Sequence, residues 1–168
     1  MKRLRVIRYI IFSIEIVVAY ILQTTPYLLP EVYGGKAVVL PVLALSISVF
    51  EPQIPSMIFG AVCGSLTDLS AAGPIGYYSV GVVIICYIVS TLMENYVKTN
   101  LASVMIIALA CIPLMLFVHF LFYYLFVGYV DAWTFFVSHY VSRIIYTLAF
   151  VPVLYGLNRR VSAVLRSE

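Results

Sequence analysis

The chain has 168 residues, of which 64% are hydrophobic and only 10% are charged, with a formal net charge of +3. Soluble domains usually carry about 25% charged residues, and a soluble fold of this size has too little interior to bury so many apolar side chains. This composition excludes a soluble globular domain. With few charges, 9 glycines and 3 cysteines, it also excludes a disordered, collagen-like or disulfide-rich chain. An integral membrane protein remains.

Six apolar runs follow one another along the chain, separated by short polar or turn-forming segments. The runs cover residues 9–29, 37–50, 53–67, 77–93, 101–127 and 133–157. They are continuously apolar rather than alternating, which predicts spanning helices and not a β-barrel. The second and third runs would each be only ~22 Å long as helices, against a hydrocarbon core of ~30 Å. We interpret them as two short spans whose flanks extend the helices; a re-entrant hairpin is the alternative.

Basic residues gather at the two ends of the chain and set the expected orientation. They are Lys2, Arg3, Arg5 and Arg8 before the first run and Arg159, Arg160 and Arg166 after the last one. Six crossings place both ends on one side, and short basic flanks stay in the cytoplasm. The sequence thus predicts one all-α transmembrane domain over residues 1–168, a bundle of six helices with cytoplasmic tails at 1–8 and 158–168. Glu15 interrupts the first run, which therefore reads as a retained helix rather than a cleaved signal peptide.

Several polar residues fall inside the apolar runs. An ionisable group in lipid costs about 2.5 to 3.5 kcal/mol on insertion scales, so it is expected to face protein or water. His139, Arg143 and Thr147 are spaced by four and form one stripe on the last helix. With Glu15 they predict an intramembrane polar network, in which Arg143 pairs with Glu15 first and with Asp68 second. A pocket for an anionic group is the alternative interpretation.

The third run carries Gly60, Gly64 and Asp68 at a spacing of four, followed by a loop of small residues that ends at Gly76. Two glycines one turn apart let another helix approach closely in lipid. Asp68 falls in the last turn of its helix, where a carboxylate opposes the negative end of the helix dipole. Such an unfavourable position suggests a specific partner, which is either the 70–76 turn that it caps or a second protein.

The sequence offers no arrangement that is typical of catalysis or metal binding. His119 and His139 are isolated, without an HExxH pattern or a paired acidic motif. Cys63, Cys86 and Cys111 lie far apart in apolar runs, as buried small side chains do. We therefore expect no enzyme activity, no metal and no cofactor.

Two segments resemble a known family. Leu22-Gln23-Thr24-Thr25-Pro26 resembles the Leu-Gln-x-x-Pro element of the bacterial rod shape-determining protein MreD family. Gly60, Gly64 and Asp68-Leu69, followed by Pro74-Ile75-Gly76, resemble the Gly-xxx-Gly-xxx-Asp-Leu and Leu-Gly segment of that family. The candidates for a helix-packing or partner interface are therefore Gln23, Gly60, Gly64, Asp68 and Gly76.

The resemblance implies a non-catalytic membrane scaffold of the cell-wall elongation machinery that maintains cell shape. It implies a multi-pass protein of the bacterial plasma membrane that binds an MreC-like bitopic protein. The implied further partners are MreB, the RodA–penicillin-binding protein wall synthase and membrane lipids, with no nucleic acid.

A second family supplies an alternative of another class. The MreD bundle resembles the substrate-binding subunits of energy-coupling-factor vitamin transporters. Those subunits usually carry a small-xxx-small motif on helix one, which docks a coupling subunit. Here bulky residues separate Ser13 from Ala19, so that motif is absent and the scaffold is the favoured interpretation.

Overall fold

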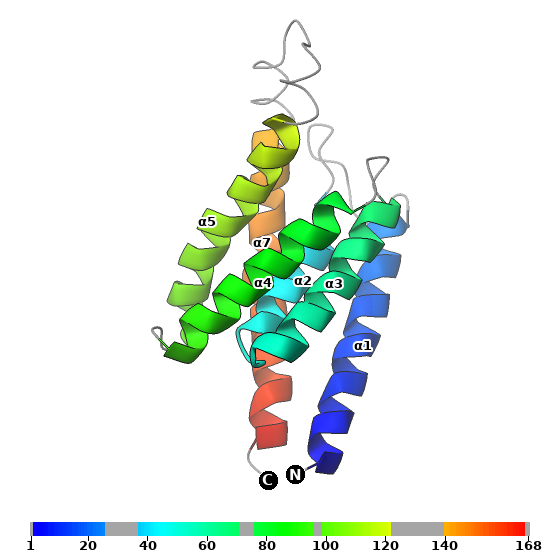
Figure 1. The fold of residues 1–168 in the computed structure, drawn as a ribbon, viewed down its shortest axis with the longest axis vertical. Helices are drawn as coiled ribbons and strands as arrows, with labels where there is room; N and C mark the ends of the chain where they lie inside the picture. Colours follow the sequence, from blue (N-terminus) through cyan, green and yellow to red (C-terminus); the bar gives the residue numbers. More distant parts are fainter. Residues whose placement is uncertain (1, 26–36, 71–75, 96–98, 122–139, 167–168) are drawn as a thin grey trace, which may run out of the picture.

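The computed structural model describes residues 2–25, 37–70, 76–95, 99–121 and 140–166, and within these ranges it is helical without any strand. The helices are α1 (Lys2–Thr24), α2 (Val39–Ser48), α3 (Gln53–Ser70), α4 (Tyr77–Asn95), α5 (Leu101–Phe120) and α7 (Val141–Arg166) (Figure 1). The all-helical class expected from the sequence is confirmed over the described residues, and each apolar run overlaps one of these helices.

Within the described residues, four helices are long and apolar enough to cross a membrane, namely α1 over Val6–Thr24, α4, α5, and α7 over Val141–Ala163. Helix α3 has 18 residues but does not belong to this group. Helix α2 has only 10 residues, or ~15 Å of helix. The expected extension of this helix by its flanks is wrong, because residues 37 and 38 are not helical and a turn follows at 49–50.

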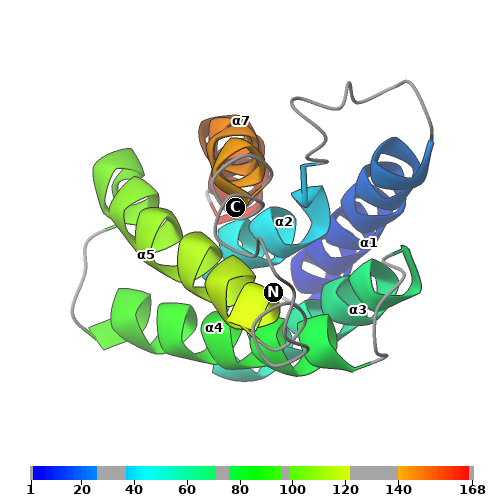
Figure 2. The ribbon, with the colours of Figure 1, turned by 90° about the horizontal axis from the view of Figure 1, so that it is seen from above.

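The short helix α2 lies at the centre of the bundle. All ten of its residues are buried, and α1, α3, α4, α5 and α7 all contact it (Figure 2). A helix that is apolar on every side is stable only when it is surrounded. One side, which includes Leu40, Leu43 and Ile47, packs in a cluster with residues of α1, α3 and α4. Val42 and Leu45 pack on the other side with residues of α4, α5 and α7.

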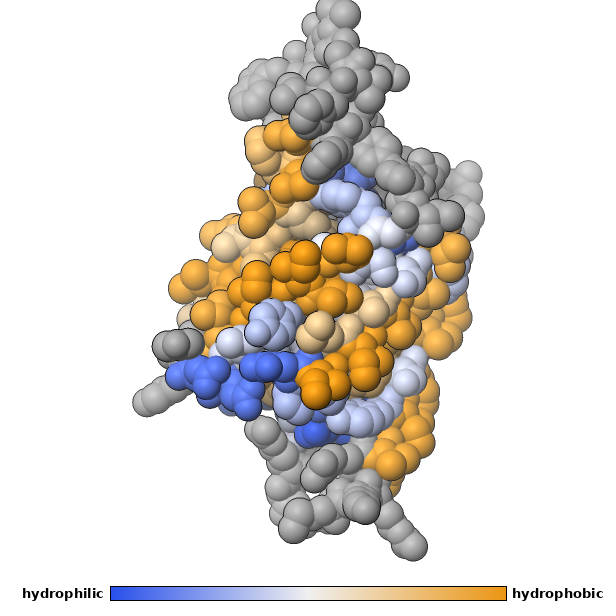
Figure 3. All heavy atoms as spheres, viewed as in Figure 1, coloured by the Kyte–Doolittle hydropathy of each residue, from blue (hydrophilic) through white to orange (hydrophobic). Residues whose placement is uncertain are grey.

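The outer faces of the surrounding helices are apolar. Exposed side chains include Ile10, Ile58, Ile84, Ile106 and Ile145, one from each of α1, α3, α4, α5 and α7. In the view of Figure 3 apolar side chains form a broad band across the described part of the bundle, with hydrophilic side chains toward its two ends. Such a continuous apolar surface would be a liability in water, and it suits contact with lipid.

The bundle has two distinct ends. Helix α1 begins and α7 ends at the same end (Figure 1), which we call the terminal end. Helices α2 and α4 begin, and α3 ends, at the opposite end. Backbone N–H groups are left without helical partners where α2 and α4 begin. Three of the polar side chains singled out by the sequence, Gln23, Asp68 and Thr147, bind these groups.

Candidate functional site

The two glycines of α3 face α4 within the same chain. A Cβ on Gly64 would lie 2.5 Å from the Cα of Ser79 and 2.8 Å from the backbone oxygen of Tyr78. A Cβ on Gly60 would lie 2.9 Å from the Sγ of Cys86. Backbone meets backbone at Gly64, whereas a side chain lies opposite Gly60. The glycine spacing thus brings α3 and α4 into close contact at the opposite end of the bundle.

Asp68 closes the first turn of α4. Its Oδ1 accepts a hydrogen bond from the backbone N–H of Tyr78 at 2.9 Å, and its Oδ2 accepts from Gly76 and Ser79 at 3.0 Å each. Asp68 is 4% exposed. A negative charge at a helix N-terminus satisfies unpaired N–H groups and complements the helix dipole. Gly76 has a φ of 104°, in the left-handed region that glycine tolerates, so it can turn its N–H toward Asp68.

Gln23 joins three helices at the same end. Its Oε1 accepts hydrogen bonds from the backbone N–H groups of Val39 at 3.0 Å and Leu40 at 3.1 Å. Its Nε2 donates to the Oγ of Ser70 at 3.0 Å. One amide side chain from α1 therefore caps the start of the central helix α2 and also holds the end of α3.

Thr147 of α7 completes the cap on α2. Its Oγ1 accepts a hydrogen bond from the backbone N–H of Val38 at 3.3 Å and donates to the backbone oxygen of Arg143 at 2.6 Å. Pro41 follows in the first turn of α2 and has no N–H to satisfy. Gln23 and Thr147 together accept the N–H groups of residues 38–40. Side chains from α1 and α7 therefore hold the start of a helix that is itself shorter than the hydrocarbon core.

A buried ion pair that the sequence analysis missed lies at the terminal end. The Nη2 of Arg8 donates to the Oε2 of Glu51 at 3.0 Å, and the Nε of Arg8 lies 2.6 Å from the Oε1 of Glu51. The Oγ of Ser90 donates to the backbone oxygen of Glu51 at 2.8 Å. This two-point contact ties α1 to the turn between α2 and α3, and Ser90 adds α4. A cavity of about 420 Å³ opens beside Glu51, with Ser90 and Glu94 in its lining.

The expected pair between Glu15 and Arg143 is not formed. Among the described residues, the ion pair present is that between Arg8 and Glu51, and both carboxyl oxygens of Glu15 are buried without a hydrogen-bond partner. Glu15 lies eight residues, or ~12 Å of helix, below Gln23, which is level with the start of α2. Arg143 lies one turn beyond Thr147 in the other direction, so the two charges sit at different depths.

The other residues considered for the predicted polar network do not come together around Arg143 in the described part of the chain. Asp68 binds backbone amides and not Arg143. Thr147 is linked to Arg143 only through the backbone oxygen of that residue. His139 lies outside the described residues.

The other histidine takes part in aromatic packing. The Nδ1 of His119 lies 2.9 Å from the hydroxyl of Tyr140, and the imidazole ring packs against the rings of Tyr77 and Tyr78 at centroid distances of 5.3 and 5.4 Å. In the ranges that the structure describes, no three His, Cys, Asp or Glu side chains come together as a metal site. The polar side chains found here mainly terminate helices and tie them together.

One comparison with known proteins gives a match. A family model described as rod shape-determining protein MreD matches residues 3–161, nearly the whole chain. No curated protein and no solved structure matches the chain. The matched region includes Gln23, Asp68 and Thr147, which hold the starts of α2 and α4.

Proposed function

Because the chain belongs to the MreD family of rod shape-determining proteins, we propose that it is a non-catalytic membrane scaffold of the cell-wall elongation machinery, which maintains cell shape by binding an MreC-like bitopic partner. One observation carries this proposal: Gln23, Asp68 and Thr147 all bind backbone groups at helix ends. Side chains used in this way fix the shape of a bundle, and a fixed shape is what a docking platform needs. MreB and the RodA–penicillin-binding protein wall synthase are the further proposed partners.

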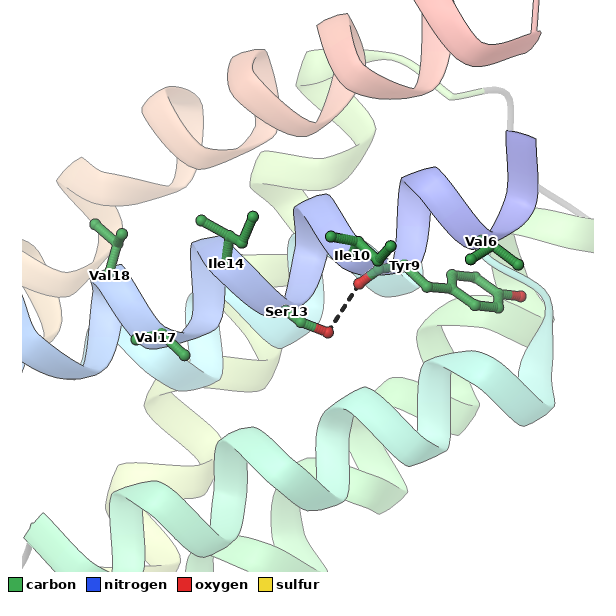
Figure 4. A pocket seen from close by; sticks show the side chains of 7 residues that line it. All are labelled: Val6, Tyr9, Ile10, Ser13, Ile14, Val17 and Val18. Atoms are coloured by element: carbon green, nitrogen blue, oxygen red, sulfur yellow. Dashed lines mark hydrogen bonds between the residues drawn. The ribbon is translucent and has the colours of Figure 1, made fainter. Parts of the chain in front are cut away.

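The proposed docking surface for the partner's spanning helix is the outward face of α1. A groove of about 480 Å³ runs along this face, lined by Val6, Tyr9, Ile10, Ser13, Ile14, Val17 and Val18 (Figure 4). Ser13 is the small residue in this lining, and its hydroxyl is turned back onto the backbone oxygen of Tyr9 at 2.8 Å. The small Ser13 side chain thus leaves a shallow depression between larger apolar side chains. Small residues on such a face permit close helix approach in lipid.

The glycine face of α3 is not proposed as this docking surface. Gly60 and Gly64 are buried against α4, so a second protein could reach them only by displacing α4. The exposed face of α1 needs no such rearrangement, because its apolar side chains already point away from the bundle.

Co-purification with the MreC-like protein tests the proposal. Ser13→Phe fills the groove on α1 and should reduce recovery of the partner and round the cells, while the variant keeps its own membrane abundance. Val153→Phe is the matched control, because Val153 is 62% exposed on the outer face of α7. Normal partner recovery and normal cell shape with Ser13→Phe would reject the α1 surface. Normal cell shape in cells that lack the whole chain would reject the scaffold function itself.

The orientation in the plasma membrane forms part of the same proposal. Six crossings with both termini in the cytoplasm are supported by the Lys and Arg residues at the two ends of the chain. Reporter fusions after Lys36 and Asp131 should be external, and fusions after Lys98 and Arg166 internal. An external fusion after Arg166 would reject this topology.

A further inference from the structure

Two polar side chains inside the bundle have no hydrogen-bond partner among the described residues. Asn158 of α7 is 0% exposed, and neither its amide nitrogen nor its amide oxygen is bonded there. Glu15 of α1 has both carboxyl oxygens buried and unbonded. Each residue lies at least eight residues from the ends of its helix, well inside the bundle. Because a buried amide or carboxylate is costly to leave unpaired, these atoms require a ligand.

The two side chains approach each other at one level of the bundle. Gln23 and Thr147 both bind the start of α2, which gives α1 and α7 a common reference level. From that level toward the terminal end, Glu15 is ~12 Å and Asn158 ~16 Å along its helix. The two helices run in opposite directions (Figure 1), and each side chain tilts toward the N-terminus of its own helix. These tilts bring the carboxyl group and the amide to the same depth.

Around the axis of α1, Glu15 points to the side of α7. The rings of Tyr9 and Phe12 contact the ring of Phe59 on α3. Successive residues of a helix are rotated by about 100°, so Tyr9 and Glu15 lie about 60° to either side of Phe12. Helix α1 packs against α2, α3 and α7. The side of α1 that faces away from α3, where Glu15 lies, is therefore the side of α7.

Asn158 lies on the face of α7 that packs toward α1. Leu154 and Val161, one turn before and one turn after it, pack against the cluster that contains Phe12. Ser46 of the central helix α2 adds a third group. It is completely buried, its hydroxyl has no partner among the described residues, and it lies ~10 Å from the start of α2, at a neighbouring depth.

We propose that Glu15 and Asn158, together with Ser46, bind one small monovalent cation between α1, α2 and α7. Carboxylate, amide and hydroxyl oxygens are the donors that hard cations prefer. One carboxylate balances one positive charge, whereas a divalent ion would leave a net charge in the apolar interior. Because the three residues come from distant parts of the chain, no local motif indicates this site. It lies on the inner side of α1 and does not depend on the scaffold function.

Binding of radioactive Na⁺ to the purified full-length protein in detergent tests the site, with choline chloride keeping the ionic strength constant. Wild type should bind Na⁺ saturably. Glu15→Gln keeps the shape of the side chain but not its charge and should abolish binding. Asn158→Leu should weaken binding about tenfold, the effect of losing one contact to a charged group. Glu94→Gln is the matched control, because it removes the same charge at an exposed position and should bind Na⁺ as wild type does.

The melting temperature of the same samples gives a second measurement. Na⁺ in place of choline should raise it for wild type, since a ligand that binds only the folded state stabilises that state, and should not raise it for Glu15→Gln. Absence of Na⁺ binding by wild type, or equal binding by wild type and Glu15→Gln, overturns the proposal. Displacement of Na⁺ by choline or by micromolar Ca²⁺ also overturns it, in favour of an organic or a divalent cation.

The matched variants keep the test decisive. If Glu15→Gln does not fold, Asn158→Leu decides, and an unchanged affinity for Na⁺ in that variant overturns the site. Both measurements use the isolated chain, so a failure of the scaffold function would leave them unchanged.

Discussion

The Oδ1 of Asp68 lies 2.9 Å from the backbone nitrogen of Tyr78, so a side chain near the end of α3 closes the first turn of α4. Gly64, one turn earlier on α3, leaves room for the backbone of the next residue, Ser79. The carboxylate cap and the close helix approach therefore act at the same place. This hairpin is where small substitutions in the chain should have the clearest effects.

Replacing Asp68 should destabilise the protein. Asp68→Ala leaves the N–H groups of Gly76, Tyr78 and Ser79 without their acceptor, and loss of a helix N-cap costs about 0.5 to 2 kcal/mol. Asp68→Asn keeps one oxygen but loses the charge, so its effect should be smaller. The melting temperature in detergent and the abundance in the membrane should both fall more for Asp68→Ala than for Asp68→Asn.

Glu94→Gln is the control for the loss of charge. Glu94 is exposed at the end of α4, so the same chemical change should leave the melting temperature nearly constant. Unchanged stability of Asp68→Asn together with weaker partner recovery would contradict the capping role and favour a contact with a second protein.

The two glycines of α3 should differ in their tolerance of a methyl group. Gly64→Ala forces a Cβ against the backbone of Ser79 and should cost about 1 to 3 kcal/mol, the usual range for overpacking. Gly60→Ala meets the Sγ of Cys86, which can move more easily, so its effect should be milder. Gly156→Ala is the control: nothing lies within 4 Å of the added Cβ, and alanine is favoured over glycine in a helix. Melting temperatures that fall equally for all three variants would contradict this ranking.

The sequence predicted the helices well because each is encoded by a continuous local pattern. The runs at 77–93 and 53–67 lie within α4 and α3, and the charge pattern pointed to Asp68 as unusual. The pattern did not predict that α2 is buried on every side, since a short apolar run is equally consistent with a membrane span. Burial of α2 depends on the helices around it, which are distant in sequence.

Long-range pairing explains the remaining errors. Arg8 and Glu51 are 43 residues apart, and nothing in the local sequence links a basic N-terminal segment to a turn before Pro52. Glu15 was expected to pair with Arg143 because both charges are costly in lipid. That free-energy cost does not determine how deep in the bilayer each of the two side chains lies. The register between α1 and α7 is set by Gln23 and Thr147, which both bind the start of α2.

The ion pair between Arg8 and Glu51 should respond differently to single and double substitution. The Glu51 side chain is 0% exposed and that of Arg8 11%, so removing one partner strands a buried charge. Such a loss costs about 3 to 5 kcal/mol, whereas an apolar replacement of both partners is often close to neutral. Arg8→Met and Glu51→Leu should each lower the melting temperature strongly, and the double variant should recover a large part. A double variant as unstable as the sum of the single ones would show that the pair contributes little.

The cap on α2 gives the last prediction. Gln23→Leu removes the acceptor for Val39 and Leu40 and the donor to Ser70. Thr147→Val keeps the side-chain shape but removes the acceptor for Val38. A buried N–H left without a partner costs about 1 to 3 kcal/mol, so both variants should be less stable, and Gln23→Leu more so because it strands two N–H groups. Hydrogen exchange at Val39 and Leu40 should accelerate in Gln23→Leu and much less in Thr24→Val, whose hydroxyl bonds only within α1. Equal exchange in the two variants would mean that Gln23 does not hold the start of α2.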